Sequence, residues 1–291
     1  MAARKSGAKP RADEVGDEVQ ADDGLSAVVV NNWTEDKHHL LRKYLELQAK
    51  ARINWLGPGS KGATYIDLFC GTGRSRVIGR TSFIDGSPVL AWKASQDDGA
   101  PFTKLYIADI NERARVACEK RLRALGAPVE AVEGTAVEAA KKVVEKLDPY
   151  GLHFAFLDPF NLESLELEII RTLASLRRMD ILVHLSAMDI RRNAERYLSG
   201  TSDRFEKCAP GWAKVAKRNG TREEIFLGLL EHWKRQVDGI GMETSSGFHS
   251  MRNGQNQVIY WLLLLYRNDL AARFWNIVLK HKPNETRGLF D

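Results

Sequence analysis

The segment from Thr64 to Gly73 constrains the fold of this chain more than any other. Its first half, Tyr65 to Phe69, is a mostly apolar run with β-branched and aromatic residues, which is typical of a buried parallel strand. Its second half contains Gly71 and Gly73, and glycine allows both a tight turn and a close approach of the backbone to a ligand. The segment therefore predicts a strand that leads into a ligand-binding turn. A glycine-rich turn in another kind of α/β protein is the alternative.

Asp67 lies inside the end of this expected strand. An isolated carboxylate is costly to bury, so it needs either a cationic ligand group or a ring of backbone donors as its partner. We therefore count Asp67 among the candidate cofactor-binding residues, together with Phe69, Gly71 and Gly73.

A second strand is expected over residues 105–108, and Asp109 and Ile110 follow it directly. A carboxylate in this position is placed to accept hydrogen bonds from the two hydroxyls of a ribose. Asp109 lies 38 residues beyond Gly71, where a separation of about 20 is usual. An inserted stretch explains most of the excess, because the next helix signal comes only at Ser87-Pro88, an N-cap Ser followed by Pro.

The inserted stretch, residues 74–86, is expected to form an extended loop or a hairpin over the ligand site. It carries three arginines, Arg74, Arg76 and Arg80. They either engage a carboxylate or a phosphate or are solvated, and we favour solvation because arginines are mostly exposed.

Two further strands are expected to end at the same edge of the sheet. The third, residues 129–133, is followed by Thr135, and the fourth, residues 153–157, ends in Asp158-Pro159-Phe160. Ligands of open α/β sheets bind beyond the carboxyl ends of the strands. Asp158, Pro159 and Phe160 are therefore the candidate catalytic residues, and an Asp-Pro turn with a packed Phe is the alternative.

The later part of the chain predicts the rest of the sheet. A fifth strand is expected over residues 179–185, and two more near 246–252 and 257–266 are linked through Asn253-Gly254, a strong hairpin signal. Residues 189–238 between them are mostly helical in pattern. The predicted fold class is α/β: a Rossmann-like, seven-stranded, mostly parallel sheet with a terminal antiparallel hairpin and a helical insertion.

The insertion over 189–238 carries more Lys and Arg than Asp and Glu. Aromatic residues are interleaved with these charges: Tyr197, Phe205, Trp212, Phe226 and Trp233. Such a pattern can grip a nucleic-acid strand, but a small helical cap with a solvated face explains it at least as well. The formal net charge of +5 permits a nucleic-acid partner without requiring one.

The beginning of the chain is expected to be a disordered segment over residues 1–30, with the folded domain over 31–291. Six acidic residues stand there among few hydrophobic ones (Asp13, Glu14, Asp17, Glu18, Asp22 and Asp23), and such a segment buries too little surface to offset its ordering entropy. A helix is expected to follow, capped by Thr34. Its polar residues Lys37, His38 and His39 are interpreted as surface or satisfied residues rather than catalytic ones.

Composition and cysteine spacing exclude several classes of protein. A hydrophobic content of 44% with 28% charged residues is typical of a soluble globular protein. The apolar run Val258–Tyr266 is too short to span a bilayer as a helix, and the first residues lack a secretory signal. The cysteines, Cys70, Cys118 and Cys208, have no C-x-x-C spacing. We therefore expect reduced thiols, no metal site and a cytoplasmic location.

The motifs together resemble class I S-adenosylmethionine (SAM)-dependent methyltransferases. The stretch from Asp67 to Gly73 is similar to their D-x-F-x-G-x-G motif, and Asp158-Pro159-Phe160 is similar to the Asp-Pro-Pro-Tyr/Phe motif of amino-group methyltransferases, with one Pro in place of two. The resemblance implies that SAM is the cofactor and that Asp158 orients the methyl acceptor, such as a nitrogen of a nucleic-acid base. It implies a cofactor site made of Asp67, Phe69, Gly71, Gly73, Asp109, Ile110 and Thr135, where Thr135 replaces an Asp or Asn that often binds the adenine amino group.

The order of the motifs resembles, more narrowly, the three-Cys-motif partner protein family. The residues that carry this resemblance are Trp33, Lys37-His38, Tyr44-Leu45, Tyr65–Phe69, Gly71, Gly73, Asp85–Pro88, Asp109–Asn111 and Phe156–Phe160. The resemblance implies a bacterial role beside a separate protein with a three-cysteine motif. The cysteines of this chain are not that motif, because their spacing differs.

Two functions are therefore expected. The first is a SAM-dependent methyltransferase with an unidentified acceptor, and the second is a non-catalytic SAM-binding or interaction protein that acts with the three-cysteine protein. Asp67, Asp109 and Asp158 favour the first, whereas the single Pro159 and Thr135 favour the second.

Overall fold

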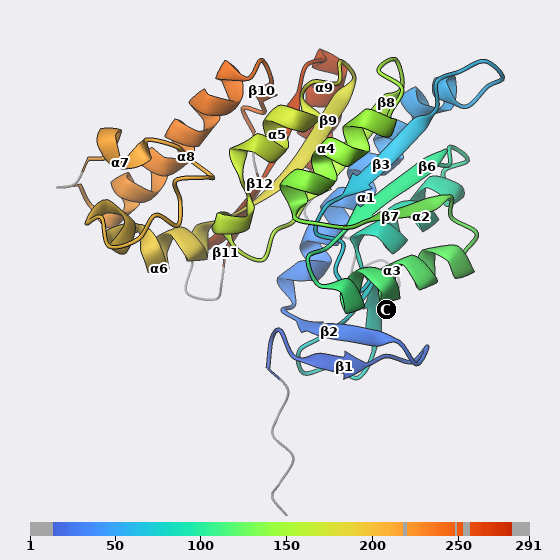
Figure 1. The fold of residues 1–291 in the computed structure, drawn as a ribbon, viewed down its shortest axis with the longest axis horizontal. Coiled ribbons are helices and arrows are strands. Elements are labelled where there is room, and N and C mark those ends of the chain that lie inside the picture. Colours follow the sequence, from blue (N-terminus) through green and yellow to red (C-terminus); the bar gives the residue numbers. More distant parts are fainter. Residues whose placement is uncertain (1–13, 218–219, 248, 253–256, 281–291) are drawn as a thin grey trace, which may run out of the picture.

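The computed structural model describes residues 14–217, 220–247, 249–252 and 257–280. Its centre is a sheet in the order β10-β12-β9-β8-β3-β6-β7, and β11 also pairs with β12 (Figure 1). The parallel strands are β3 (Ala63–Asp67), β6 (Lys104–Ala108), β7 (Val129–Val132), β8 (Leu152–Leu157) and β9 (Met179–Ser186). β12 (Val258–Tyr266) runs antiparallel to β9, and β10 (Glu243–Thr244) and β11 (His249–Arg252) run antiparallel to β12. The predicted terminal antiparallel strands are present, although Asn253-Gly254 lies outside the described residues.

β3 is the strand at which the direction of the chain through the sheet reverses. It lies between β6 and β8, with Ile66 opposite both Tyr106 and Ala155. Every residue of β3 is buried, as expected for a parallel strand covered on both faces. β6 and β7 extend the sheet on one side and β8 and β9 on the other. The carboxyl ends on either side of β3 are therefore where an open sheet of this kind binds its ligand.

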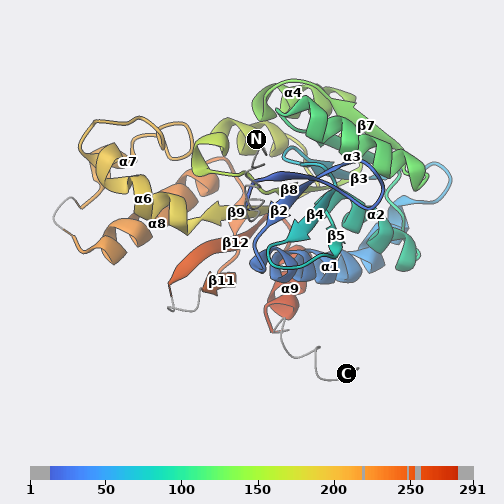
Figure 2. The same ribbon diagram turned by 90° about the horizontal axis from the view of Figure 1, so that it is seen from below.

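Helices cover both faces of the sheet. One face is packed by α1 (Trp33–Arg52), α2 (Ser87–Asp97), α3 (Glu112–Ala124) and α9 (Asp269–Val278). The other is packed by α4 (Ala136–Lys146), α5 (Leu167–Leu173) and the insertion. Figure 2 shows α1 and α9 on one side of the sheet and α4 on the opposite side. A short 3-10 helix at Ile53–Trp55 follows α1, and another at Leu162–Ser164 comes after β8. This arrangement confirms the predicted fold class, except that the described central sheet has eight strands instead of the seven expected, because β10 adds a short strand beside β12.

The insertion is helical, as predicted, and consists of α6 (Ala187–Leu198), α7 (Trp212–Val215) and α8 (Arg222–Gly239). Its interleaved aromatic side chains are buried rather than displayed. The rings of Tyr197 and Trp212 stack 5.5 Å apart, and Phe205 packs against both. These rings are the core of the insertion, so they offer no stacking surface to nucleic-acid bases.

A second, small sheet lies below the carboxyl ends of the central strands (Figure 1). It contains β1 (Glu18–Gln20), β2 (Ser26–Val30), β4 (Arg74–Val77) and β5 (Phe83–Asp85). β4 and β5 form the hairpin predicted for residues 74–86, and β2 pairs with β4 in parallel. The expectation of disorder over residues 1–30 is therefore wrong for residues 14–30, and residues 1–13 lie outside the described part of the chain.

α1 and α2 begin differently from the prediction. α1 starts at Trp33, one residue before the expected cap Thr34. The N-cap of α2 is Gly86, and the hydroxyl of Ser87 donates a hydrogen bond to Asp67 instead of capping the helix. Within the described residues, no helix combines the length and the apolar character needed to cross a membrane.

Candidate functional site

The carboxylates predicted from the strand ends meet at one edge of the sheet. Asp67 is the last residue of β3, Asp109 follows β6 and Asp158 follows β8. β6 and β8 are the direct neighbours of β3, so these carboxylates flank the point at which the chain direction reverses.

Asp67 is completely buried, and the chain itself supplies its hydrogen-bond partners. Its carboxylate accepts hydrogen bonds from the Ser87 hydroxyl (2.7 Å), the Phe69 backbone N–H (3.1 Å) and the Tyr65 hydroxyl (3.1 Å). Burial raises the pKa of the Asp67 carboxyl to about 7, although these donors act in the opposite direction. Asp67 therefore joins the end of β3, the glycine turn and the start of α2. Its contact with a ligand remains a prediction, as does that of the half-buried Phe69, whose ring packs against the core.

The two glycines of the turn have different surroundings. Both have left-handed backbone conformations, with φ of +53° at Gly71 and +75° at Gly73. A Cβ at Gly73 would lie 3.0 Å from the Sγ of Cys118 and 3.2 Å from its Cα, whereas a Cβ at Gly71 would meet no atom within 4 Å. Gly73 is therefore required by packing, and Gly71 leaves an open approach to the turn.

Asp109 is tied directly to this turn. Its two carboxylate oxygens accept hydrogen bonds from the backbone N–H groups of Gly71 (2.9 Å) and Asn111 (2.8 Å). Burial raises the pKa of the Asp109 carboxyl, and the two N–H donors oppose that shift. The next residue, Ile110, is 78% exposed. The structure thus places a partly buried carboxylate beside an uncovered apolar side chain.

Thr135 caps α4. Its hydroxyl accepts a hydrogen bond from the Glu138 backbone N–H, and the Glu138 carboxylate accepts one from the Thr135 backbone N–H at 2.8 Å. The hydroxyl also lies 3.1 Å from that carboxylate, to which it donates. A capping box accounts for Thr135 locally, and its predicted role toward an adenine stays a prediction.

Asp158 is the centre of a cluster that the sequence did not predict, formed with Lys37, His38, His184 and Tyr260. The Lys37 ammonium donates a hydrogen bond to Asp158 Oδ2 at 2.5 Å, and His184 Nδ1 lies 3.2 Å from Asp158 Oδ1. The His184 and Tyr260 rings are 4.6 Å apart, and Lys37 lies over the Tyr260 ring. Of the two expectations for Lys37 and His38, surface or satisfied, the surface position is wrong because both are buried, and Lys37 is satisfied by its ion pair with Asp158.

The charges of this cluster are set by burial and by Lys37. Burial, together with the Lys37 ammonium, lowers the pKa of His38 and of His184 to about 4, so both imidazoles are neutral at pH 7. Burial raises the pKa of the Asp158 carboxyl, but Lys37 and His184 lower it by more, and the net pKa lies below its usual value. Asp158 is therefore ionised at neutral pH and already faces a cation.

Two residues next to Asp158 complete this part of the site. Pro159 is buried, and Phe160 is 90% exposed. The alternative of a packed Phe after the Asp-Pro turn is therefore wrong, since the ring of Phe160 is available to a ligand or a partner.

A helical pattern in the sequence could have revealed part of the cluster. Lys37 precedes Leu40, Leu41 and Tyr44 by three, four and seven residues, so it belongs to the buried stripe of α1. His184 lies near the end of the fifth predicted strand, among buried residues. No local pattern, however, indicates that both approach Asp158.

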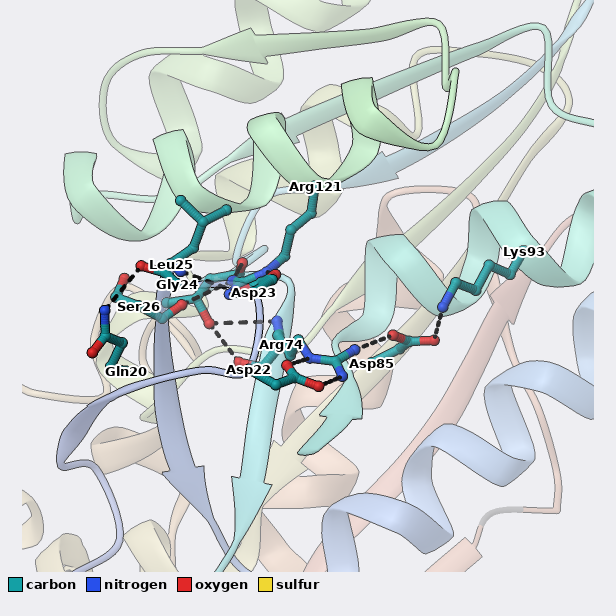
Figure 3. A network of polar contacts seen from close by, with 11 residues as sticks. Gln20, Asp22, Asp23, Gly24, Leu25, Ser26, Arg74, Asp85, Lys93 and Arg121 are labelled. Carbon is teal, nitrogen blue, oxygen red and sulfur yellow. Dashed lines mark hydrogen bonds and ion pairs between the residues drawn. The ribbon is translucent and has the colours of Figure 1, made fainter. Parts of the chain in front are cut away.

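The small sheet is anchored to the glycine turn through two arginines (Figure 3). Arg121 of α3 is buried and binds both oxygens of Asp23 at 2.7 and 2.8 Å. Its Nη1 also donates to the carbonyl oxygens of Ser26 (2.8 Å) and Thr72 (2.6 Å), and Thr72 lies between the two glycines. The hairpin of β1 and β2 is therefore linked to the glycine turn through the hydrogen bonds of Arg121.

Arg74 makes the second anchor. It binds both oxygens of Asp22 at 2.8 and 2.7 Å and also Asp85 at 3.1 Å, which in turn pairs with Lys93 (Figure 3). Arg80 pairs with Glu35 at 2.8 Å. The interpretation of Arg74 as solvated is therefore wrong, whereas the Arg80 side chain is exposed. The ion pairs of Arg74 with Asp22 and of Arg121 with Asp23 are the physical reason that the acidic residues before β2 are ordered.

The described residues contain no group of three or more His, Cys, Asp or Glu side chains arranged to hold a metal ion. Cys70, Cys118 and Cys208 are buried and not joined in disulfides.

Comparison with known proteins gives likenesses of structure only. No protein-family model and no curated protein matches the sequence. Among solved structures, the chain is similar to protein LPL1258 from Legionella pneumophila, with 12% identity, a TM-score of 0.46 and coverage of 84% of this chain and 93% of that chain. It is also similar to cofactor-bound Rv0187 from MTB, with 14% identity, a TM-score of 0.42 and coverage of 78% and 79%.

A third likeness is to the methyltransferase domain of bacterial CtHen1-CN, with 14% identity, a TM-score of 0.39 and coverage of 78% of this chain and 99% of that chain. At these TM-scores the likenesses carry no functional argument. The Rossmann-like methyltransferase fold rests on the strand order, strand directions and helix layers of the chain itself.

Proposed function

We propose that this protein binds SAM and transfers its methyl group to an acceptor held beside Asp158. The observation that carries the proposal is the position of Asp109 and its turn. A carboxylate after the strand next to β3 is hydrogen-bonded to Gly71 and followed by the uncovered Ile110, at the edge where open sheets bind ligands.

The residues present fit the chemistry of SAM. Each Asp109 oxygen accepts one backbone hydrogen bond and keeps a lone pair for a ribose hydroxyl. Ile110 offers an apolar surface to the flat face of an adenine, and the open side of Gly71 admits close approach. Asp67 accepts a hydrogen bond from the Phe69 backbone N–H, Gly73 packs closely against Cys118, and Thr135 caps α4, so each supports the backbone around it. SAM, when bound, supplies a methyl group on a sulfonium, which is activated toward nucleophiles.

The contribution of the chain to such a reaction is mainly positional. The glycine turn, supported by Arg121 and Asp23, would fix the methyl donor, and the Asp158 cluster would orient the acceptor. Holding two reactants in a productive geometry supplies a large part of a catalytic effect without covalent participation of the protein.

Replacing Asp109 with Ala tests the cofactor proposal. We expect SAM and S-adenosylhomocysteine to bind the wild type, and Asp109→Ala to weaken binding by about 1–3 kcal/mol, because hydrogen bonds to a charged acceptor are lost. Calorimetric titration measures this change. Glu119→Ala is the matched control, since Glu119 forms an ion pair with the exposed Arg123 on α3. Absence of binding of either ligand to folded wild-type protein would rule out the proposal.

A nucleic-acid acceptor is a further proposal, supported by the Lys and Arg excess of the insertion. Because the aromatic rings there are buried, any grip on a nucleic acid would come from the cationic side chains alone. Affinity for an oligonucleotide should then fall steeply as salt rises, since bound counterions are released. Fluorescence anisotropy over a salt series measures it, and binding that is flat with salt or absent at low salt contradicts this acceptor class.

The second candidate function is a SAM-binding protein without turnover that acts beside a three-cysteine-motif protein. One observation favours it: Asp158 is already paired with Lys37 inside the chain. The uncovered Phe160 offers such a partner an apolar contact. In this case wild-type protein would bind SAM and the three-cysteine protein but would methylate nothing in the presence or absence of that partner.

A further inference from the structure

The cluster around Asp158 contains a cation, a carboxylate, an imidazole and an aromatic ring, and these groups indicate which class of methyl acceptor can bind beside them. Lys37 lies at the start of α1, Asp158 after β8, His184 near the end of β9 and Tyr260 on β12. The elements that carry these four residues are far apart in the sequence, and they converge where the candidate acceptor site begins. The cluster is not sealed, because the side chains of Asp158 and His184 are 20% and 13% exposed.

We propose that Lys37 is an acceptor-binding residue and that the acceptor presents a hydroxyl oxygen, rather than an amino nitrogen, to the Lys37 ammonium. This inference rests on the proposed function, since it names the acceptor of the same site.

Both carboxylate oxygens of Asp158 already face partners within the chain, which argues against an amino group as the methyl acceptor. Such an acceptor needs a carboxylate that accepts its N–H groups and balances the positive charge that develops on nitrogen during transfer. Asp158 Oδ2 already accepts from Lys37, and Oδ1 faces His184. The Lys37 ammonium, 2.5 Å from the carboxylate, offsets its charge and repels a second cation in this weakly solvated place.

The same arrangement suits an oxygen acceptor. A hydroxyl becomes nucleophilic as it approaches an oxyanion, and a fixed cation stabilises that developing negative charge. An ammonium group has three N–H donors, and Lys37 uses one of them on Asp158. Asp158 therefore positions Lys37, and within the described part of the chain the ammonium makes no other hydrogen bond, so two donors remain for the acceptor oxygen.

The cluster is partly open to solvent, which can take the proton of the acceptor. Burial and the Lys37 ammonium lower the pKa of the His184 imidazole and keep it neutral, so it adds no second cation to the site. The acceptor O–H bond breaks, its proton passes to solvent water, and the oxygen keeps the electron pair that forms the bond to the methyl carbon. The electron pair of the former carbon–sulfur bond remains on sulfur.

Labelled methyl transfer tests the acceptor class. Wild-type protein is incubated with methyl-labelled SAM and cell extract, and the products are separated into alkali-labile esters, alkali-stable ethers and N-methyl compounds. We expect the label in alkali-stable ethers, at least tenfold less of it with Lys37→Met, and partial recovery with Lys37→Arg, which keeps the cation. Lys43→Met on the same helix is the control, because Lys43 pairs with the exposed Glu46.

The other outcomes overturn the inference and separate it from the cofactor proposal. Label in N-methyl products or in esters, or equal transfer by Lys37→Met and wild type, excludes Lys37 as the binder of an acceptor hydroxyl. Absence of transfer by wild-type protein that still binds SAM also overturns it, while the cofactor proposal stands. Absence of SAM binding removes the cofactor proposal first.

A second measurement needs neither turnover nor SAM. Proton or nitrogen NMR of the imidazoles reports the pKa of His184 in the free protein. Lys37→Met should raise it by removing a neighbouring positive charge, and Lys43→Met should leave it unchanged. A His184 pKa that Lys37→Met does not raise means that Lys37 does not govern the cluster, and the inference fails even if the variant loses activity.

Discussion

Asp158→Ala is expected to reduce methyl transfer by about 10²-fold or more, while SAM affinity stays within a few-fold of wild type. The carboxylate holds the Lys37 ammonium and faces His184, so its loss leaves both without their orienting partner. A group that acts only during transfer affects turnover rather than cofactor binding. The cofactor contacts are made elsewhere, by Asp109 and the glycine turn.

The experiment pairs transfer from labelled SAM with calorimetric titration of S-adenosylhomocysteine. Asp158→Asn is a second variant that keeps the shape of the side chain, and Glu163→Ala is the control, since Glu163 makes an exposed ion pair with Arg204. Undiminished transfer by Asp158→Ala would remove Asp158 from the mechanism. A parallel collapse of SAM affinity would instead assign Asp158 to the cofactor site.

Gly73→Ala and Gly71→Ala are expected to impair the protein in different ways: the first mainly lowers its stability, and the second mainly lowers its affinity for SAM. At Gly73 an alanine combines the left-handed backbone with contacts of 3.0 to 3.3 Å to Cys118 and Val89. The free energy of unfolding should fall by about 2–5 kcal/mol from conformational strain and overpacking together. At Gly71 only the strain applies, about 1–2 kcal/mol, because the space beside it is open.

Urea unfolding and SAM titration together separate the two effects. Gly71→Ala should lose roughly tenfold or more in SAM affinity despite its smaller loss of stability, because its methyl group occupies the approach to the turn. Gly126→Ala is the control: Gly126 also has positive φ (+72°) and open space, but it ends α3 away from the turn. If Gly71→Ala binds SAM as well as Gly126→Ala does, the open side of Gly71 is not the ligand approach.

Much of the fold was predictable because its signals are local. The apolar run before Gly71 and the polar residues after each strand follow from which residues a parallel strand buries and which its end exposes. Asp67, Asp109 and Asp158 could be placed at one edge for this reason. The helical character of 189–238 also followed from local pattern, whereas the burial of its aromatic rings did not.

The partners of these residues could not be predicted in the same way. Lys37 and Asp158 are 121 residues apart, and Asp23 and Arg121 are 98 apart. An acidic stretch with few hydrophobic residues predicts disorder when it is considered alone. Its order here comes from Arg74 and Arg121, which become neighbours only when β4 and α3 are in place.

The sequence by itself thus determined the class of sheet, the strand ends and the carboxylates at them, because periodicity and glycine placement act over a few residues. Only the tertiary structure decided the state of those carboxylates. Asp67 is enclosed by Ser87 and Tyr65, Asp109 is tied to Gly71, and Asp158 is paired with Lys37. The physical reason is that the charge and reactivity of a buried group depend on the atoms within a few ångströms of it, and chain distance does not specify those atoms.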